Sequence, residues 1–170
     1  MRKLLLSILL FASLSVFAQR KIVPTSSIKI EGKIKAEKTF TLLDLDTFKK
    51  EPIPDQIIYN HKGEAKDTLQ NLKGVLLKTI LEPIEFIYEK PRYLNEFYFV
   101  FIASDGYKVV FSWNEIYNTE IGNSLFIITE MDGKKRDEID NRIAFIATND
   151  LKSGRRYIKG LEKIVVRQVD

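Results

Sequence analysis

FYFVFIASDGYKVVFSW, residues 97–113, is the stretch that decides the fold this sequence predicts. Its first seven residues, Phe97 to Ala103, are all apolar or aromatic, and such an unbroken run is typical of a strand covered on both faces. Ser104-Asp105-Gly106 then supplies the short polar side chains and the glycine that tight turns favour. Tyr107 to Phe111 follows as a second strand, in which Lys108 is the one charged residue. The sequence therefore predicts a buried β-hairpin at the centre of the chain.

The end of this stretch predicts a helix. Ser112 and Glu115 have the Ser-x-x-Glu spacing of a capping box, in which the hydroxyl and the carboxylate satisfy the first free amides of a helix. At the turn itself, Asp105 and Tyr107 have two interpretations. They are residues that a hairpin needs for its own geometry, and they are also residues able to line a pocket.

The rest of the chain adds strands around this hairpin. Seven Tyr, eleven Phe and many β-branched residues favour strands over helices. Alternation and short apolar runs predict strands in residues 28–34, 40–48 (with one helical turn), 56–60, 65–69, 124–131, 143–147 and 161–166. Residues 75–81 have apolar spacing typical of a short helix, and residues 82–96, with Pro83 and Pro91, are the longest irregular segment. We predict one β-rich α+β domain, residues 28–170, with two or three short helices.

The chain start has the features of a secretory signal peptide. Arg2-Lys3 precedes an apolar run, residues 4–17, and Ala18 completes a cleavage site of small residues. That run is shorter than the roughly 20 residues a membrane-spanning helix needs. We predict a signal peptide in residues 1–18, a leader in residues 19–27, and a periplasmic or secreted protein without stable membrane insertion after cleavage. Because the chain has no Cys, it lacks the residue that a lipoprotein anchor requires.

The composition of the chain excludes some kinds of chemistry and some classes of partner. The absence of Cys excludes disulfides, thiolate nucleophiles and thiolate metal ligands. The net charge is +4, of which Arg2 and Lys3 contribute two, so cleavage leaves +2 (4 − 2). This is well below the basic density typical of nucleic-acid binding, and we expect no nucleic-acid partner.

Five segments, taken in order, resemble the molybdopterin-binding domain of the sulfite oxidase family in a small secreted form. They are IKIEGKI with FTLLDL (28–45), LKGVLLKTIL (72–81), ASDGYKVVFSWNEI (103–116), LFIITEMDGK (125–134) and RRYIKGLEKIVV (155–166). The resemblance implies an α+β fold that holds a molybdopterin cofactor. It also implies a cysteine thiolate on molybdenum and oxygen-atom transfer at the metal.

The sequence departs from the family pattern at two places. The family cysteine falls just after the strand that ends near Tyr59, where this chain has Asn60-His61. Neither an amide nor an imidazole replaces a thiolate, a soft ligand that tunes a high-valent metal. The Gly-Pro-x-Arg pattern that precedes the late strand reads Asp140-Asn141-Arg142-Ile143 here. We therefore expect no ordinary sulfite oxidase chemistry.

Two groups of residues are candidates for a site. Arg155, Arg156 and Lys159 lie in a basic stretch, and the resemblance matches Arg156-Tyr157 to a basic–aromatic pair that contacts the pterin phosphate. Adjacent guanidinium groups beside a glycine suit a phosphate, because arginine forms forked, charge-assisted hydrogen bonds. A solvated loop that closes the sheet is the alternative interpretation.

The second candidate group is Asn60-His61, at the position of the family's metal ligand. His61 is the only histidine and is a candidate metal ligand or proton carrier; the alternative is an exposed turn residue in His-Lys-Gly. Two functions follow from these candidates. One is binding of a pterin or similar anionic ligand without classical oxidase activity. The other is a non-catalytic module that binds a periplasmic protein partner through the aromatic segment 82–98.

Overall fold

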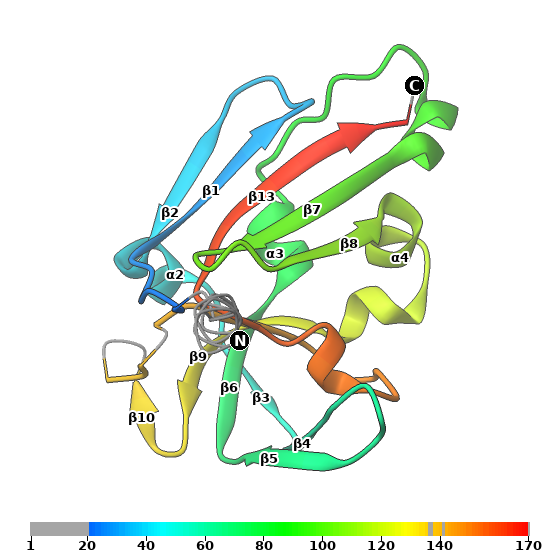
Figure 1. The fold of residues 1–170 in the computed structure, drawn as a ribbon. Helices are drawn as coiled ribbons and strands as arrows, with labels where there is room; N and C mark the ends of the chain where they lie inside the picture. Colours follow the sequence, from blue (N-terminus) through cyan, green and yellow to red (C-terminus); the bar gives the residue numbers. More distant parts are fainter. Residues whose placement is uncertain (1–20, 136–137, 141, 170) are drawn as a thin grey trace, which may run out of the picture.

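The computed structural model describes residues 21–135, 138–140 and 142–169, which form two main sheets and a separate two-stranded hairpin (Figure 1). The first sheet has five strands in the order β2 (Lys38–Thr41), β1 (Ser27–Gly32), β13 (Leu161–Gln168), β7 (Phe97–Ala103) and β8 (Lys108–Ser112). β1 and β13 are parallel, and the other pairs in this sheet are antiparallel. The predicted central hairpin is confirmed as β7 and β8.

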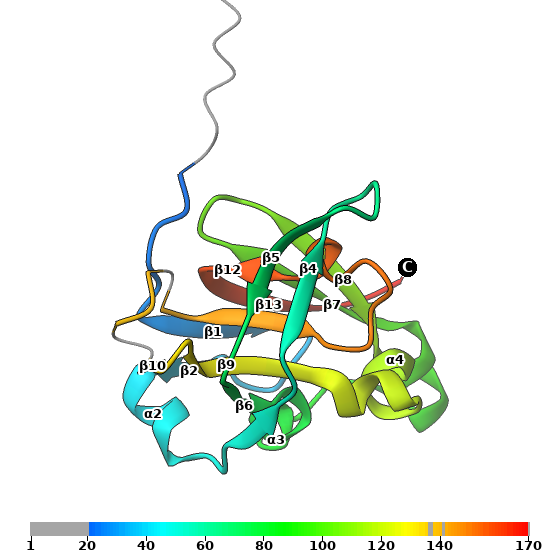
Figure 2. The same ribbon diagram turned by 90° about the horizontal axis from the view of Figure 1, so that it is seen from below.

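The second sheet is antiparallel along its length. Its order is β12 (Ile158–Lys159), β11 (Ala144–Ala147), β9 (Leu125–Met131), β6 (Leu72–Leu76) and β3 (Glu51–Ile53), with β10 (Lys134–Lys135) paired to β9. The separate hairpin consists of β4 (Gln56–Tyr59) and β5 (Ala65–Leu69). Figure 2 shows this hairpin crossing over the second sheet, with its turn extending beyond the sheet.

The helices of the described residues are short. The α-helices are α2 (Leu42–Thr47), α3 (Leu77–Leu81) and α4 (Trp113–Tyr117), and the 3-10 helices are η2 (Pro91–Glu96), η3 (Glu120–Ser124) and η4 (Ser153–Arg155). The predicted capping box of α4 is present: the Ser112 hydroxyl accepts from the Glu115 amide at 3.1 Å, and the Glu115 carboxylate accepts from the Ser112 amide at 2.7 Å. None of the described helices has the length and apolarity needed to cross a membrane.

The main core lies between the two sheets, with α3 beside it. Three phenylalanines join the sheets there: Phe101 on β7 and Phe111 on β8 pack against Phe145 on β11. The ring centroids of Phe101 and Phe145 are 4.8 Å apart, and all three side chains are fully buried. Contacts of this kind add to apolar burial because the ring edges meet neighbouring faces. The two sheets therefore share one core.

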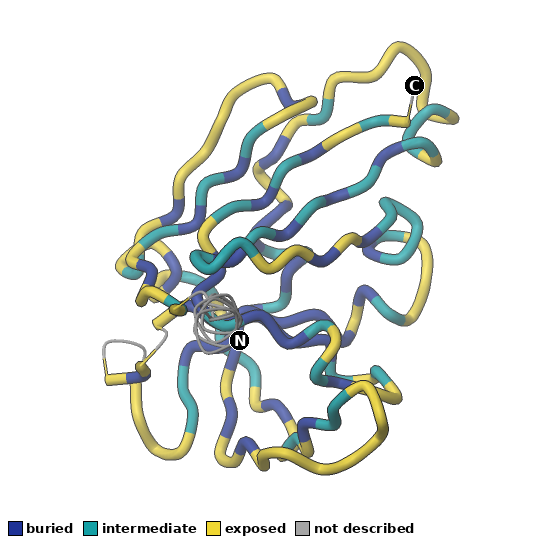
Figure 3. The backbone as a smooth tube through the Cα atoms, viewed as in Figure 1, coloured by how far each residue is buried: buried dark blue, intermediate teal, exposed yellow. Residues whose placement is uncertain are grey.

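A smaller core lies on the other face of the second sheet, under the β4–β5 hairpin. Ile58 of β4 and Leu69 of β5 pack there with Phe126 and Ile128 of β9. As a result β9 is covered on both faces over its first five residues, and β11 is buried along its whole length. In Figure 3 the strands of the second sheet are largely buried, while the turn of the β4–β5 hairpin is exposed.

Two predictions about local structure were wrong. β7 is predicted to be covered on both faces, but its residues alternate between buried and half-buried, so one face of the strand is only partly covered. The helix predicted over residues 75–81 begins at Leu77, because Leu72–Leu76 forms a strand between β3 and β9. The irregular segment 82–96 ends in the 3-10 helix η2. The predicted signal peptide and Asn141 lie outside the described residues.

Candidate functional site

The loop before β12 is attached to the edge of β4 by a side chain. Ser153, which is 2% exposed, donates its hydroxyl to the Ile57 carbonyl at 2.7 Å and accepts from the Tyr59 amide at 3.2 Å. A strand partner would satisfy the same two backbone groups, so the serine hydroxyl takes the place of a strand at this edge. The loop that carries Arg155 is thereby held at the end of β4.

Three further contacts fix this loop. Gly154 lies so close to β4 that a Cβ atom there would be 2.4 Å from the Tyr59 carbonyl oxygen, a distance that only glycine avoids. Lys152 donates to the His61 carbonyl at 2.9 Å. From the opposite side, the Tyr107 hydroxyl donates to the Arg155 carbonyl at 2.6 Å. The loop is therefore tied both to the β4–β5 hairpin and to the β7–β8 turn.

These contacts shape an open groove of about 390 Å³, which we call the Arg155 groove. Its lining residues come from the β4–β5 hairpin, the β7–β8 turn and η4: Ile58, Tyr59, Asn60, His61, Lys66, Tyr107, Gly154 and Arg155. Arg155 is exposed, and no side-chain partner of its guanidinium is present among the described residues. Lys66 is paired with Glu64 at 3.3 Å, with both side chains more than half exposed. The groove therefore offers a free guanidinium beside a solvated ion pair.

The turn of the β4–β5 hairpin is organised by Asn60. Its side-chain oxygen accepts from the amides of Lys62 and Glu64, at 2.9 and 3.0 Å, and its side-chain nitrogen donates to the Glu64 carboxylate at 2.8 Å. This arrangement explains an asparagine at this position without any ligand, because asparagine readily bonds nearby backbone in turns. His61 follows as an exposed residue on the rim of the groove.

Arg156 turns away from the Arg155 groove. Its guanidinium donates to both carboxylate oxygens of Asp150, at 2.7 and 2.5 Å, and to Glu115 of α4 at 3.0 Å. It also lies over the ring of Phe111, 4.4 Å from the centroid. The hydrogen bonds that Arg156 donates to Asp150 raise the pKa of Arg156; partial burial opposes this effect, and the contact with Glu115 adds to it. The structure thus places Arg156 between two carboxylates and the core.

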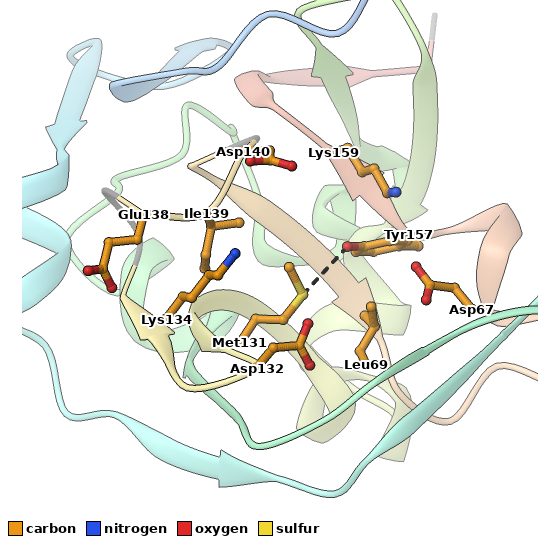
Figure 4. Close-up of a pocket in the computed structure, with 10 residues that line it drawn as sticks. All are labelled: Asp67, Leu69, Met131, Asp132, Lys134, Glu138, Ile139, Asp140, Tyr157 and Lys159. Atoms are coloured by element: carbon orange, nitrogen blue, oxygen red, sulfur yellow. Dashed lines mark hydrogen bonds between the residues drawn. The ribbon is translucent and has the colours of Figure 1, made fainter.

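Tyr157 and Lys159 each line the same two pockets. Both line a slot of about 320 Å³, together with Ile22, Ala103, Asp105, Tyr107 and Gly154, which we call the Tyr107 slot. Both also line a pocket of about 200 Å³ shown in Figure 4, where the Tyr157 hydroxyl points toward the Met131 sulfur at 4.0 Å. Burial, followed by the charges of Asp67 and Asp132, raises the pKa of Tyr157 to about 12. Its phenol therefore stays protonated at neutral pH.

The structure places the six residues predicted for the site in three separate locations. Asn60, His61 and Arg155 meet in the Arg155 groove, although 94 residues separate His61 from Arg155 in the sequence (155 − 61). Tyr157 and Lys159 line the Tyr107 slot, and Arg156 belongs to the carboxylate cluster. Sequence reasoning did not assign Lys66 to the site, and it did not predict that Ser153 anchors the loop to β4. It named Asp105 and Tyr107 as possible pocket residues, and both line the slot.

The residues near His61 do not fit a molybdenum ion. The chain has no Cys, and within residues 21–135, 138–140 and 142–169 no three His, Cys, Asp or Glu side chains gather as a metal site would require. His61 shares its groove with Lys66 and Arg155, neither of which is a metal ligand in its charged form.

Comparison with known proteins supports the fold. No protein-family model matches the chain, and no curated protein matches it in sequence. Among solved structures, the sulfane dehydrogenase SoxCD from Paracoccus pantotrophus matches with a TM-score of 0.60 and 12% sequence identity. The match covers 85% of this chain and 39% of that one, so this chain spans well under half of its structural neighbour. The predicted fold class, an α+β domain resembling the sulfite oxidase fold, is confirmed.

Proposed function

We propose that this protein binds a small phosphate-bearing organic anion in the Arg155 groove and performs no molybdenum chemistry. The observation that carries the proposal is the Arg155 guanidinium, which is exposed in the groove without a side-chain partner among the described residues while its backbone is held by the Tyr107 hydroxyl. A guanidinium on a fixed backbone suits phosphate, because it presents forked donors in a set direction. The family resemblance makes a pterin phosphate the first ligand to test.

The neighbouring groups support an anion. Lys66 and Arg155 are cationic, and Glu64 balances only one of these two charges. His61 adds a donor on the rim, and it carries positive charge when protonated. The Arg155 groove, at about 390 Å³, is within the size range of small-molecule sites. We propose a periplasmic or secreted location for this binding, in keeping with the predicted signal peptide.

Replacing Arg155 tests this function. We expect Arg155→Ala to weaken binding of inorganic phosphate and of a pterin phosphate about tenfold, the usual effect of losing a charge-assisted hydrogen bond. The measurement is isothermal titration calorimetry at low salt. Arg167→Ala is the matched control, because Arg167 is an exposed arginine of β13 outside the lining of the groove. Equal affinities for wild type and Arg155→Ala, or no binding by wild type, would contradict the proposal.

A second function is favoured by a different surface. Ile87 and Tyr88 are 48% and 43% exposed, and with Tyr93 they line a pocket of about 460 Å³ at the other end of the first sheet. Lys33, Glu89, Glu96 and Gln168 complete its rim. Exposed apolar side chains around a pocket, with polar groups at the margin, are typical of a protein-binding surface. We therefore propose a protein-interaction module as the alternative.

This alternative has its own test. We expect a double variant, Ile87→Ser with Tyr88→Ser, to release a partner that co-purifies with the protein from its native host, and to weaken rebinding of that purified partner at least tenfold, since buried aromatic anchors dominate interface energies. Arg155→Ala serves as the control and should retain the partner. A partner bound equally by both variants would count against the Ile87–Tyr88 surface.

A further inference from the structure

We propose that Met131 is a site of reversible oxidation, and that the Tyr157 hydroxyl holds the oxygen atom of the resulting sulfoxide. The site is the pocket of about 200 Å³ in Figure 4, which we call the Met131 pocket. It has no described lining residue in common with the Arg155 groove, so this inference does not depend on the proposed function. The chain has two methionines and no cysteine, and removal of the predicted signal peptide with Met1 would leave Met131 as its single sulfur.

The sulfur of Met131 can be reached by a small oxidant. Met131 is the last residue of β9, is half-buried, and packs against the edge of the smaller core while lining the pocket. Figure 4 shows its sulfur directed into the pocket, toward Tyr157. Asp132, Lys134 and Asp140, which also line the pocket, are exposed, so the pocket opens to solvent. A pocket of this size admits water, and hydrogen peroxide is only slightly larger.

The pocket is polar enough to accept a sulfoxide. Oxidation turns an apolar thioether into a polar group, and in an apolar core this change disrupts packing. Six of the ten residues that line the Met131 pocket are charged: Asp67, Asp132, Lys134, Glu138, Asp140 and Lys159. The added oxygen would therefore enter a polar, solvent-connected space, while the rest of the Met131 side chain keeps its apolar contacts.

The position of the Tyr157 hydroxyl fits the oxidised form better than the reduced form. Tyr157 is 8% exposed, and among the described residues its hydroxyl has the Met131 sulfur as acceptor, at 4.0 Å. This contact is weak, because it is long and a thioether is a poor acceptor. An S–O bond and an O–H···O hydrogen bond of about 2.7 Å, placed end to end, span slightly more than this distance. An oxygen on the Tyr157 side of the sulfur would therefore lie within hydrogen-bond distance of the hydroxyl.

The oxidation step needs one co-reactant, a peroxide. The Met131 sulfur attacks one oxygen of hydrogen peroxide, so that an S–O bond forms and the O–O bond breaks. Sulfur loses two electrons, peroxide gains them, and the proton of the transferred oxygen leaves with the departing hydroxide as water. Methionine sulfoxide reductases reverse this change. Because burial raises the pKa of Tyr157 to about 12, its hydroxyl keeps the proton that it would donate to the sulfoxide oxygen.

Mass spectrometry tests the site itself. We expect the peptide containing Met131 to gain one oxygen when the folded protein is treated with dilute hydrogen peroxide, at a rate comparable with that in urea. Methionine sulfoxide reductases should then restore the original mass. Oxidation of Met131 in urea but not in the folded protein would overturn the site, and a sulfoxide that the reductases leave in place would overturn reversibility.

Thermal unfolding of oxidised and reduced protein tests the role of Tyr157. Tyr157→Phe keeps the ring and removes the hydroxyl, so oxidation should lower its Tm by about 3 °C more than it lowers the Tm of wild type, the effect of one hydrogen bond. Tyr107→Phe is the matched control, because its hydroxyl bonds the Arg155 carbonyl outside the lining of the Met131 pocket, and its shift should equal that of wild type. Met131→Leu should show no shift with peroxide. Equal shifts in wild type and Tyr157→Phe would overturn the role of Tyr157.

Discussion

Phe101→Ala should lower the free energy of unfolding by about 4 kcal/mol, the cost of removing a fully buried phenylalanine from a packed core. Phe101 is 0% exposed, and its ring centroid lies 5.2 Å from that of Phe111 and 4.8 Å from that of Phe145. Phe145 belongs to the second sheet, so the cavity would open between the two sheets. Urea unfolding monitored by circular dichroism gives the value directly.

Val110→Ala is the control for this prediction. Val110 is on β8, next to Phe111, but 53% of its surface is exposed. Truncating it should change the free energy of unfolding by no more than about 0.5 kcal/mol. If Phe101→Ala lost less than about 1 kcal/mol, the ring cluster would not be the contact that holds the sheets together.

Arg156→Ala should cost about 2 to 3 kcal/mol of stability, although the residue is part of a polar loop. Truncation leaves the carboxylates of Asp150 and Glu115 without their shared cation, and these side chains are 16% and 32% exposed. It also uncovers the ring of Phe111, over which the guanidinium lies at 4.4 Å. Losing one partner of a partly buried ion pair is costly because the remaining charge stays desolvated, and partial exposure moderates the loss.

Arg155→Ala is the control for stability, because Arg155 is exposed and should change the free energy of unfolding by less than about 0.5 kcal/mol. Arg156→Lys should recover only part of the loss, since an ammonium cannot form the forked bonds to Asp150. Phosphate titration of folded Arg156→Ala separates a structural role from the predicted role as an anion ligand. A structural arginine leaves the affinity unchanged, whereas a fall matching that of Arg155→Ala would restore the ligand role.

The predictions of local structure were wrong where tertiary contacts outweigh the local sequence pattern. Residues 75–81 have helical spacing, yet Val75 and Leu76 pair with Ile127 and Phe126 of β9, a contact 52 and 50 residues away (127 − 75; 126 − 76). Phe97–Ala103 has the composition of a strand covered on both faces, but the strand so covered is β9, because the β4–β5 hairpin packs over it. Neither outcome is visible in a window of ten residues, where only local spacing is available.

The sequence by itself determined the central hairpin, the capped helix α4, the α+β class and the absence of a thiolate, because turn residues, capping spacing and composition act locally. Only the tertiary structure decided which basic residues are free. Arg155 and Arg156 are neighbours in the chain, but one guanidinium lies open in a groove and the other is enclosed by Asp150, Glu115 and Phe111. Side-chain direction and long-range partners set that difference, and adjacent positions in a sequence carry no record of either.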